Sequence, residues 1–185
     1  ENLRTQVAFA EDDASRARLR LRVGELLATH LGDPDGALET YREVLSVDAA
    51  NEQAIVAVRG LAANVDQRQA AVEILEPIFR NAARWDDLVA TLELKLTGVE
   101  DPAQRTMELR GLAEVHESGR RVPSDAFEAY RRALHEAPDD LQTRSDLERL
   151  GGPLQRWAEV VTVFEGEAAE ANDPTVGRDL SVRAA

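Results

Sequence analysis

Three histidines are the side chains best suited to catalysis or metal binding in this chain of 185 residues. No two of His30, His116 and His135 are three or four residues apart, which is the spacing that places two ligands on one helix face. Each falls in the last turn of an expected helix, where the helix dipole favours a protonated ring and free carbonyl oxygens accept hydrogen bonds. We therefore expect structural roles for all three and no metal site.

Acidic clusters are the next candidates, because carboxylates bind calcium and act as general acids or bases. They occupy 11–13, 86–87 and 139–140, which are all expected helix starts, where negative charge offsets the helix dipole. The segment 33–36 begins like a calcium loop but lacks the remaining ligands. The chain has no Cys, no glycine-rich phosphate loop and no paired serine and histidine, so we predict no enzyme, no catalytic residues and no cofactor.

Four arginines alternate along another expected helix, at positions 16, 18, 20 and 22. Alternate residues on a helix point to nearly opposite sides, so Arg16 shares a face with Arg20, and Arg18 shares a face with Arg22. One face can form ion pairs with a neighbouring acidic helix, and the other is then available to an acidic partner.

Composition narrows the class of partner. The formal net charge of -13 argues against a grip on a nucleic-acid backbone, which requires clustered basic residues. No apolar run approaches the roughly 18 residues of a membrane span, so we expect no membrane insertion. No leader opens the sequence, which favours the cytoplasm. Lys95 is the only lysine among 22 basic residues, an imbalance typical of a GC-rich bacterial genome.

Proline, glycine and the helical period of the apolar residues predict an all-α chain of about ten to eleven helices. Good helix formers dominate, and the runs of β-branched residues that indicate strands are missing. Short loops predict that consecutive helices are antiparallel. The expected helices are 1–11, 13–31, 34–47, 51–63, 66–81, 84–98, 102–118, 123–136, 140–150, 154–171 and 174–185.

Two internal repeats run through these helices. One pattern returns 89 residues later, because Pro34-x-x-Ala37-x-Glu39-x-Tyr41-Arg42-x-x-Leu45 becomes Pro123-x-x-Ala126-x-Glu128-x-Tyr130-Arg131-x-x-Leu134. A shift of 72 residues aligns Trp85 with Trp157, Leu92 with Phe164 and Asp101-Pro102 with Asp173-Pro174. Fixed-period repeats in a helical chain predict a right-handed α-solenoid of antiparallel hairpins.

The repeats lead to three further expectations. The two spacings differ by about one helix, so we expect one inserted or lost helix near 66–81, where Pro77 marks either a change in stacking or an ordinary kinked helix. Trp85 and Trp157 should begin equivalent helices, and each should pack on the preceding helix. The 72-residue copy stops opposite the middle of a helix, so we expect residues 1–185 to be a single array cut from a longer one.

The residues Gly24…Ala37-x-x-x-Tyr41 and Ala113…Ala126-x-x-x-Tyr130…Pro138 resemble the tetratricopeptide repeat, which places small and large residues where two helices touch and proline at the exit. The two copies cover about a third of the chain. They depart from the family by one extra residue between the paired small residues, which a longer turn at 31–33 would absorb. Leu27 and His116 stand where the family has an aromatic residue.

The resemblance implies a concave groove, lined by the first helix of each pair, that holds a peptide or a helix of a partner protein. It does not imply the carboxylate-clamp subgroup, because Leu21 and Glu25 stand where that subgroup has lysine and asparagine. The sequence leaves a structural spacer open as the alternative, with self-association through the end helices. The implied groove residues are Arg18, Leu21, Arg22, Glu25 and Thr29 in one unit, and Met107, Arg110, Glu114 and Ser118 in the other.

Overall fold

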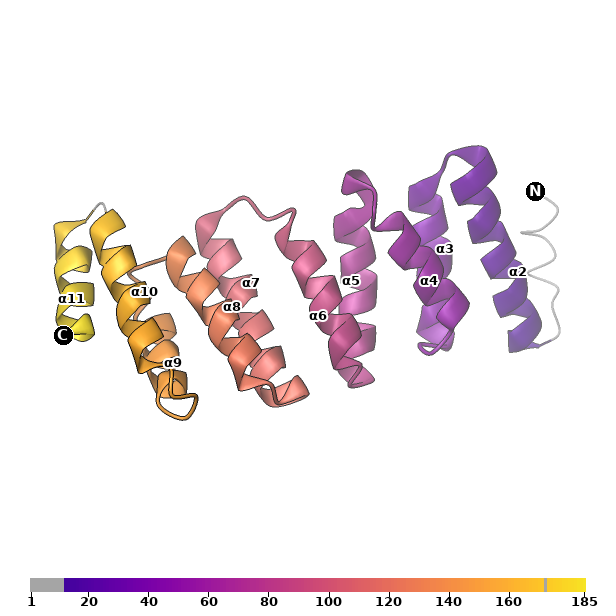
Figure 1. The fold of residues 1–185 in the computed structure, drawn as a ribbon. Helices are drawn as coiled ribbons and strands as arrows, with labels where there is room; N and C mark the ends of the chain where they lie inside the picture. The colour runs from indigo at the N-terminus through magenta and orange to yellow at the C-terminus, as the bar shows by residue number, and fades with distance from the viewer. Residues whose placement is uncertain (1–11, 172) are drawn as a thin grey trace. The chain divides into compact units, whose positions relative to one another are not determined.

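The computed structural model describes residues 12–171 and 173–185, and these residues form ten α-helices and no strand (Figure 1). The all-α prediction is therefore confirmed, while the helix expected over 1–11 lies outside the described residues. The helices are α2 (Asp13–Leu26), α3 (Pro34–Val47), α4 (Glu52–Leu61), α5 (Val65–Asn81), α6 (Trp85–Leu96), α7 (Pro102–Glu114), α8 (Pro123–Glu136), α9 (Leu141–Gly151), α10 (Trp157–Glu170) and α11 (Pro174–Ala184).

Aspartate side chains cap five of the ten helices in the described residues, within one residue of the predicted starts. Asp33, Asp101 and Asp173 each accept a hydrogen bond from a backbone N–H in the first turn, and each precedes a proline, whose missing N–H has no intrahelical partner there. Asp12 and Asp140 cap α2 and α9 in the same way. The proline and aspartate positions therefore fix the helix starts.

The described helices form two compact units, one up to Arg84 and one from Trp85 onward. In the first unit each helix from α2 to α5 packs on the next one, and α2 also contacts α4 while α3 contacts α5. The core is aliphatic, with Tyr41 as a buried aromatic residue. An ion pair from Arg20 to Glu43 (2.8 Å) joins α2 and α3, and another from Arg84 to Glu52 joins the segment after α5 to α4.

The second unit contains α6 to α11. Consecutive helices pack together, and α8 also contacts α10. Arginines join helices that are not consecutive: Arg132 of α8 reaches Glu93 of α6 with two hydrogen bonds (2.5 and 3.0 Å), and Arg156 reaches Glu128 (2.5 Å) while its guanidinium lies 4.1 Å from the centre of the Phe127 ring. The stack is therefore held by ion pairs as well as by its aliphatic core.

Both α2 and α7 end in a π-helical turn, Leu27–Leu31 (η1) and Val115–Arg120 (η2). The residue that follows each π turn has a left-handed backbone conformation. These residues are Gly32 (φ 61°) and Arg121 (φ 58°), which are 89 residues apart. A π turn adds one residue to a helix. The extra residue relative to the tetratricopeptide spacing is therefore accommodated in the helix end, and the prediction of a longer turn at 31–33 is wrong.

The 72-residue repeat is visible in the backbone. Ala83 (φ 53°) and Gln155 (φ 55°) have the same left-handed conformation, and the tryptophans that follow begin α6 and α10 as expected. Trp157 packs on the preceding helix, since a Cβ added at Gly151 would lie 3.5 Å from its ring, but it is 53% exposed. The ring of Trp85 contacts the later turn η2, where a Cβ at Gly119 would lie 2.8 Å away.

Arg144 is a buried charge that the sequence patterns do not predict. It stands in α9 at the position that Ile55 has in α4, and it is 1% exposed. Its Nε donates to the Pro138 carbonyl oxygen (2.7 Å), and the guanidinium pairs with Asp179 of α11. Arg144 therefore connects the core of the second unit to the loop before α9 and to α11.

Two remaining expectations concern single helices. The helix α5 continues through Pro77 to Asn81, and both the kink and the change in stacking expected at Pro77 stay predictions. None of the helices in the described part of the chain is long and apolar enough to cross a membrane.

Candidate functional site

The predicted groove residues of the first unit lie together on α2 and η1. Arg18, Arg22, Glu25 and Thr29 are exposed, and Leu21 is half-buried. Arg22 pairs with Glu25 on the same helix face (2.7 Å). Because both charges remain accessible, they are able to exchange this pair for contacts with another molecule.

The alternating arginines of α2 lie on two different faces of the helix, as their spacing predicts. Arg20 pairs with Glu43 of α3, and Arg16 pairs with Asp13 of its own first turn (2.8 Å). On the other face, Arg18 donates weakly to the Ala14 carbonyl oxygen (3.3 Å). Arg20 thus links α2 to α3, whereas Arg16 pairs within α2, and the opposite pair, Arg18 and Arg22, is presented to solvent.

The predicted groove residues of the second unit lie on α7 and η2, and they are not all equivalent. Met107 is 73% exposed, and Glu114 and Ser118 are exposed as well. Arg110 is half-buried, lies 3.6 Å from the Asp140 carboxylate, and has a buried Nε without a hydrogen-bond partner in the described part of the chain. Arg110 therefore forms an ion pair between α7 and the residue that caps α9.

The exposed positions of the two units correspond to one another through the 89-residue repeat. Glu25 corresponds to Glu114, and Thr29 corresponds to Ser118, so the acid and the hydroxyl are kept in both copies. At the two remaining positions the first unit has Arg18 and Arg22, whereas the second has Met107 and Gly111. We define the recognition face of each unit by these residues: Arg18, Arg22, Glu25 and Thr29 in the first, and Met107, Glu114 and Ser118 in the second.

The turn η2 contains a polar cluster that sequence reasoning did not find. Arg120 donates to Asp86 (2.8 Å) and Asp125 (2.7 Å), and its NH1 lies 3.0 Å from Nδ1 of His116. Because arginine only donates, Nδ1 is the acceptor and the proton of the neutral ring sits on Nε2. Only the arrangement of α6, η2 and α8 brings these residues together, since no sequence motif links them.

The environment of His116 contradicts the expected protonated ring. Burial lowers the pKa of His116, and the nearby Arg120 guanidinium lowers it further, while the Asp125 carboxylate opposes this. His30 and His135 are exposed, as helix-end histidines commonly are. The expectation of a ring charged by the helix dipole is therefore wrong for His116, because desolvation outweighs the dipole once the ring is buried.

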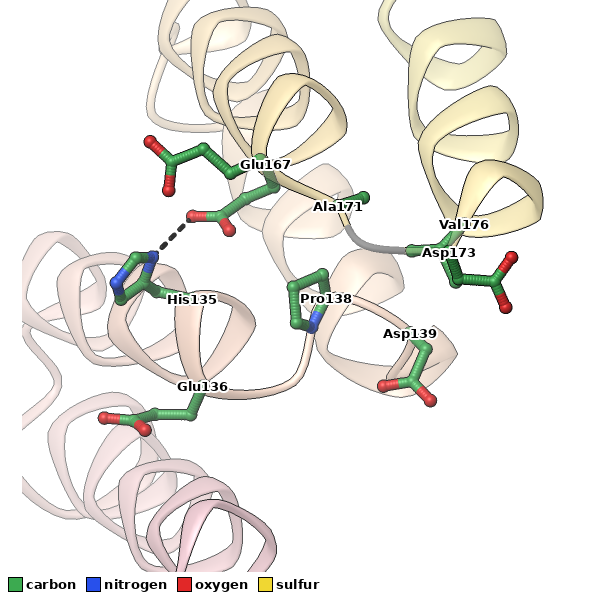
Figure 2. A pocket seen from close by; sticks show the side chains of 9 residues that line it. His135, Glu136, Pro138, Asp139, Glu167, Ala171, Asp173 and Val176 are labelled. Atoms are coloured by element: carbon green, nitrogen blue, oxygen red, sulfur yellow. Dashed lines mark hydrogen bonds and ion pairs between the residues drawn. The ribbon is translucent and has the colours of Figure 1, made fainter.

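His135 lies in a hollow of about 400 Å³ between α8, α10 and the start of α11. Figure 2 shows its ring directed at Glu167. The Nδ1 atom of the ring lies 3.1 Å from Oε1 of Glu167. The other polar side chains that line the hollow are carboxylates, with no hydroxyl or thiol nucleophile beside the histidine. The lining residues are His135, Glu136, Pro138, Asp139, Glu167, Glu170, Ala171, Asp173 and Val176.

Metal ligands do not gather at this hollow or elsewhere in the two described ranges, where no group of three or more histidine, aspartate and glutamate side chains is arranged to hold an ion. The hollow therefore offers acidic surface without the geometry of a metal centre.

Comparison with known proteins adds no assignment, since no protein-family model matches the chain and no curated protein matches it.

Proposed function

We propose that the chain is a non-enzymatic interaction protein, a tetratricopeptide-like solenoid that binds a peptide or a helix of a partner protein on its recognition faces. The observation that carries the proposal is the correspondence of Glu25 with Glu114 and of Thr29 with Ser118. All four side chains are exposed and lie on the first helix of equivalent helix pairs.

Charge and shape would select the partner. A glutamate on each face suits a basic side chain of the ligand, Arg18 and Arg22 suit an acidic one, and Met107 offers a flexible apolar contact. Because the helices are already folded, binding does not require the protein to order a loop, which keeps the entropic cost low. The net charge of -13 makes nucleic acid an unsuitable ligand.

The test begins with peptides selected from a displayed random library against the full chain. In nuclear magnetic resonance titrations, the bound peptide should shift the amide signals of α2 and η1 or of α7 and η2. The double variant Arg18→Glu with Arg22→Glu should weaken a peptide bound to the first unit by about fivefold or more, and the effect should shrink as salt rises. Met107→Asp is the corresponding variant for the second unit.

The control is the double variant Arg42→Glu with Arg131→Glu. These two exposed arginines occupy equivalent positions in α3 and α8, away from the recognition faces, and their replacement should leave binding unchanged. Arg110 is left intact because it is half-buried. A library that yields no binding peptide, or peptides insensitive to all these variants, would refute the proposal and favour the structural spacer.

A further inference from the structure

A second hollow adjoins the one around His135. It lies between α7, α8 and α10 and has a volume of about 490 Å³. The two hollows share His135, Glu136, Glu167 and Glu170, so together they form one groove along α8 and α10, which we call the α8–α10 groove. All the helices that border it belong to the second unit, and none of its residues belongs to a recognition face.

The helices α8 and α10 run in the same direction along this groove. Arg156, which directly precedes α10, pairs with Glu128 in the first half of α8. Near the ends of the two helices, Glu167 of α10 pairs with His135 of α8. Both helices therefore terminate at the same end of the groove, where the negative ends of their dipoles favour a cation.

The charges of the side chains change sign along the groove. Arg131 and Arg132 lie on the side nearer the helix starts. The Arg131 side chain is 50% exposed and donates from Nε to Glu128 (2.8 Å), so it is able to bind a further group. Near the helix ends the groove carries the exposed carboxylates of Asp139 and Glu170. The groove therefore has a basic end and an acidic end.

The floor between the two ends is apolar and includes a glycine. Leu109 is 1% exposed and Val163 is half-buried. Gly166 lies in the interior of α10, where glycine is less favourable than alanine, and a Cβ built at this position would have open space around it. Packing of the described residues does not require this glycine, and its missing side chain keeps the groove open.

The first unit has larger apolar side chains at the equivalent positions. The 89-residue repeat pairs Val163 with Ile74 and Glu167 with Ile78. Ile74 is 5% exposed and Ile78 is half-buried, and α5 contacts α3 as α10 contacts α8. The α8–α10 groove therefore results from the side chains of the second unit and is not a general feature of the repeat.

We propose that the α8–α10 groove binds an extended segment of a partner protein that carries an acidic residue and, about four residues away, a basic residue. The acidic residue pairs with Arg131, the basic residue pairs with Glu170, and an apolar residue between them packs on Val163. The proposal goes beyond the function assigned to the recognition faces and does not depend on it.

The spacing of the two charges follows from helix geometry. Thr162, which lines the hollow beside the arginines, lies about 12 Å from Glu170 along α10. An extended segment covers this distance in about four residues, and residues at every second position point to the same side. The hollow has the size of a small-ligand site, so it suits side chains of an extended segment better than a helix about 10–12 Å in diameter.

The probe is the peptide acetyl-Glu-Thr-Val-Thr-Arg-amide, which places its acidic, apolar and basic residues on one side of an extended chain. It is added to the full chain in a nuclear magnetic resonance titration at low salt. Saturable shifts of the Thr162 and Gly166 amide signals should accompany binding. Glutamine in place of either charged residue of the peptide should weaken binding by about fivefold or more, and this difference should shrink as salt rises.

Substitution of Gly166 separates binding from folding. Gly166→Leu should abolish binding because the leucine fills the groove, and it should not lower the melting temperature, because the position has open space and leucine is the better helix former. Gly60→Leu is the matched control. Gly60 lies in α4 of the first unit and also has open space at its Cβ position, so its replacement should leave binding unchanged.

Charge reversal tests each end of the groove. Glu170→Arg should weaken the peptide by about tenfold or more, and a peptide with glutamate in place of its arginine should bind this variant better than it binds the unmodified chain. Arg131→Glu should weaken the peptide similarly, whereas Arg42→Glu, at the equivalent position of α3, should have no effect. A peptide held on the recognition faces should respond to neither Arg131→Glu nor Arg42→Glu, which distinguishes the two sites.

The proposal is wrong if the peptide gives no saturable shifts up to about 1 mM, or if the Gly166→Leu variant binds it as the unmodified chain does. It is also wrong if arginine amide alone binds as tightly as the peptide, because the groove then holds a small cation and not a partner segment. Circular dichroism of each variant checks folding. If a variant unfolds, the glutamine-substituted peptides test the same contacts on the unmodified chain.

Discussion

His116 and Leu27 occupy equivalent positions in η2 and η1, and both are buried, yet only one of them titrates. The histidine accepts a hydrogen bond from Arg120, and Arg120 also binds Asp86 and Asp125. At the scale of single residues, the second unit has thus exchanged an aliphatic contact for a polar network. A buried polar network of this kind fixes one arrangement of side chains, and the folded state loses free energy when one member changes its protonation state.

The pH dependence of stability tests this network. The pKa of His116 in the folded protein lies below its ordinary value of 6.5, so the unfolded chain takes up a proton first as pH falls. The stabilising contribution of His116 is therefore complete above about pH 6.5 and is lost as pH falls from there toward the folded pKa. Besides Arg120, the charges that face the ring are Asp125 and Glu93, which favour its protonation, and Arg132, which opposes it.

We expect His116→Leu, which installs the residue found at position 27, to lose less stability than the unmodified chain between about pH 7.5 and about pH 5.5. Urea denaturation at each pH measures the free energy of unfolding. The two proteins differ only at position 116, so the difference between their losses of stability reports His116 and its contacts. Equal losses in the two proteins would show that the ring does not resist protonation.

At the scale of helices, the sequence predicts starts better than ends. Proline and capping aspartate are local signals, so the starts of α3, α7, α8 and α11 are found at the predicted residue. The π turns have no such signal, because they depend on how the end of a helix packs on the next one. The groove residues are implied by the tetratricopeptide resemblance and stay a prediction, whereas the half-buried state of Arg110 depends on its contact with Asp140, the residue that caps α9.

The closing residues of the two π turns provide a test at this scale. Gly32 and Arg121 are equivalent and both are left-handed, a conformation that costs arginine more than glycine. Arg121→Gly should raise the free energy of unfolding by about 0.5 to 1 kcal/mol, and Gly32→Arg should lower it by a similar amount. Denaturant melts measure both, and Arg121→Ala controls for loss of the side chain. Stabilisation by Arg121→Ala equal to that by Arg121→Gly would contradict the backbone explanation.

At the scale of the whole molecule, each unit has a core of its own. Tyr41 and Tyr130 are equivalent residues, 4% exposed in both units, and each lies beside a small residue of the preceding helix in the repeat pattern. Burial raises the pKa of Tyr130 to about 12, and the Asp146 carboxylate raises it further. The sequence predicts both tyrosines as core residues but does not show that the chain divides after Arg84.

Truncating each tyrosine should therefore act on its own unit. Tyr41→Ala and Tyr130→Ala each remove a buried aromatic ring, for which we expect a loss of about 3 to 5 kcal/mol of local stability. In arrays of repeats, stability is close to a sum over units and their nearest neighbours, so a cavity in one unit need not unfold the other. Hydrogen exchange followed by mass spectrometry should show lost amide protection in α2 to α5 for Tyr41→Ala and in α6 to α11 for Tyr130→Ala. If either variant instead lowered protection uniformly across the ten described helices, the chain would be one cooperative unit, and the division after Arg84 would have no energetic meaning.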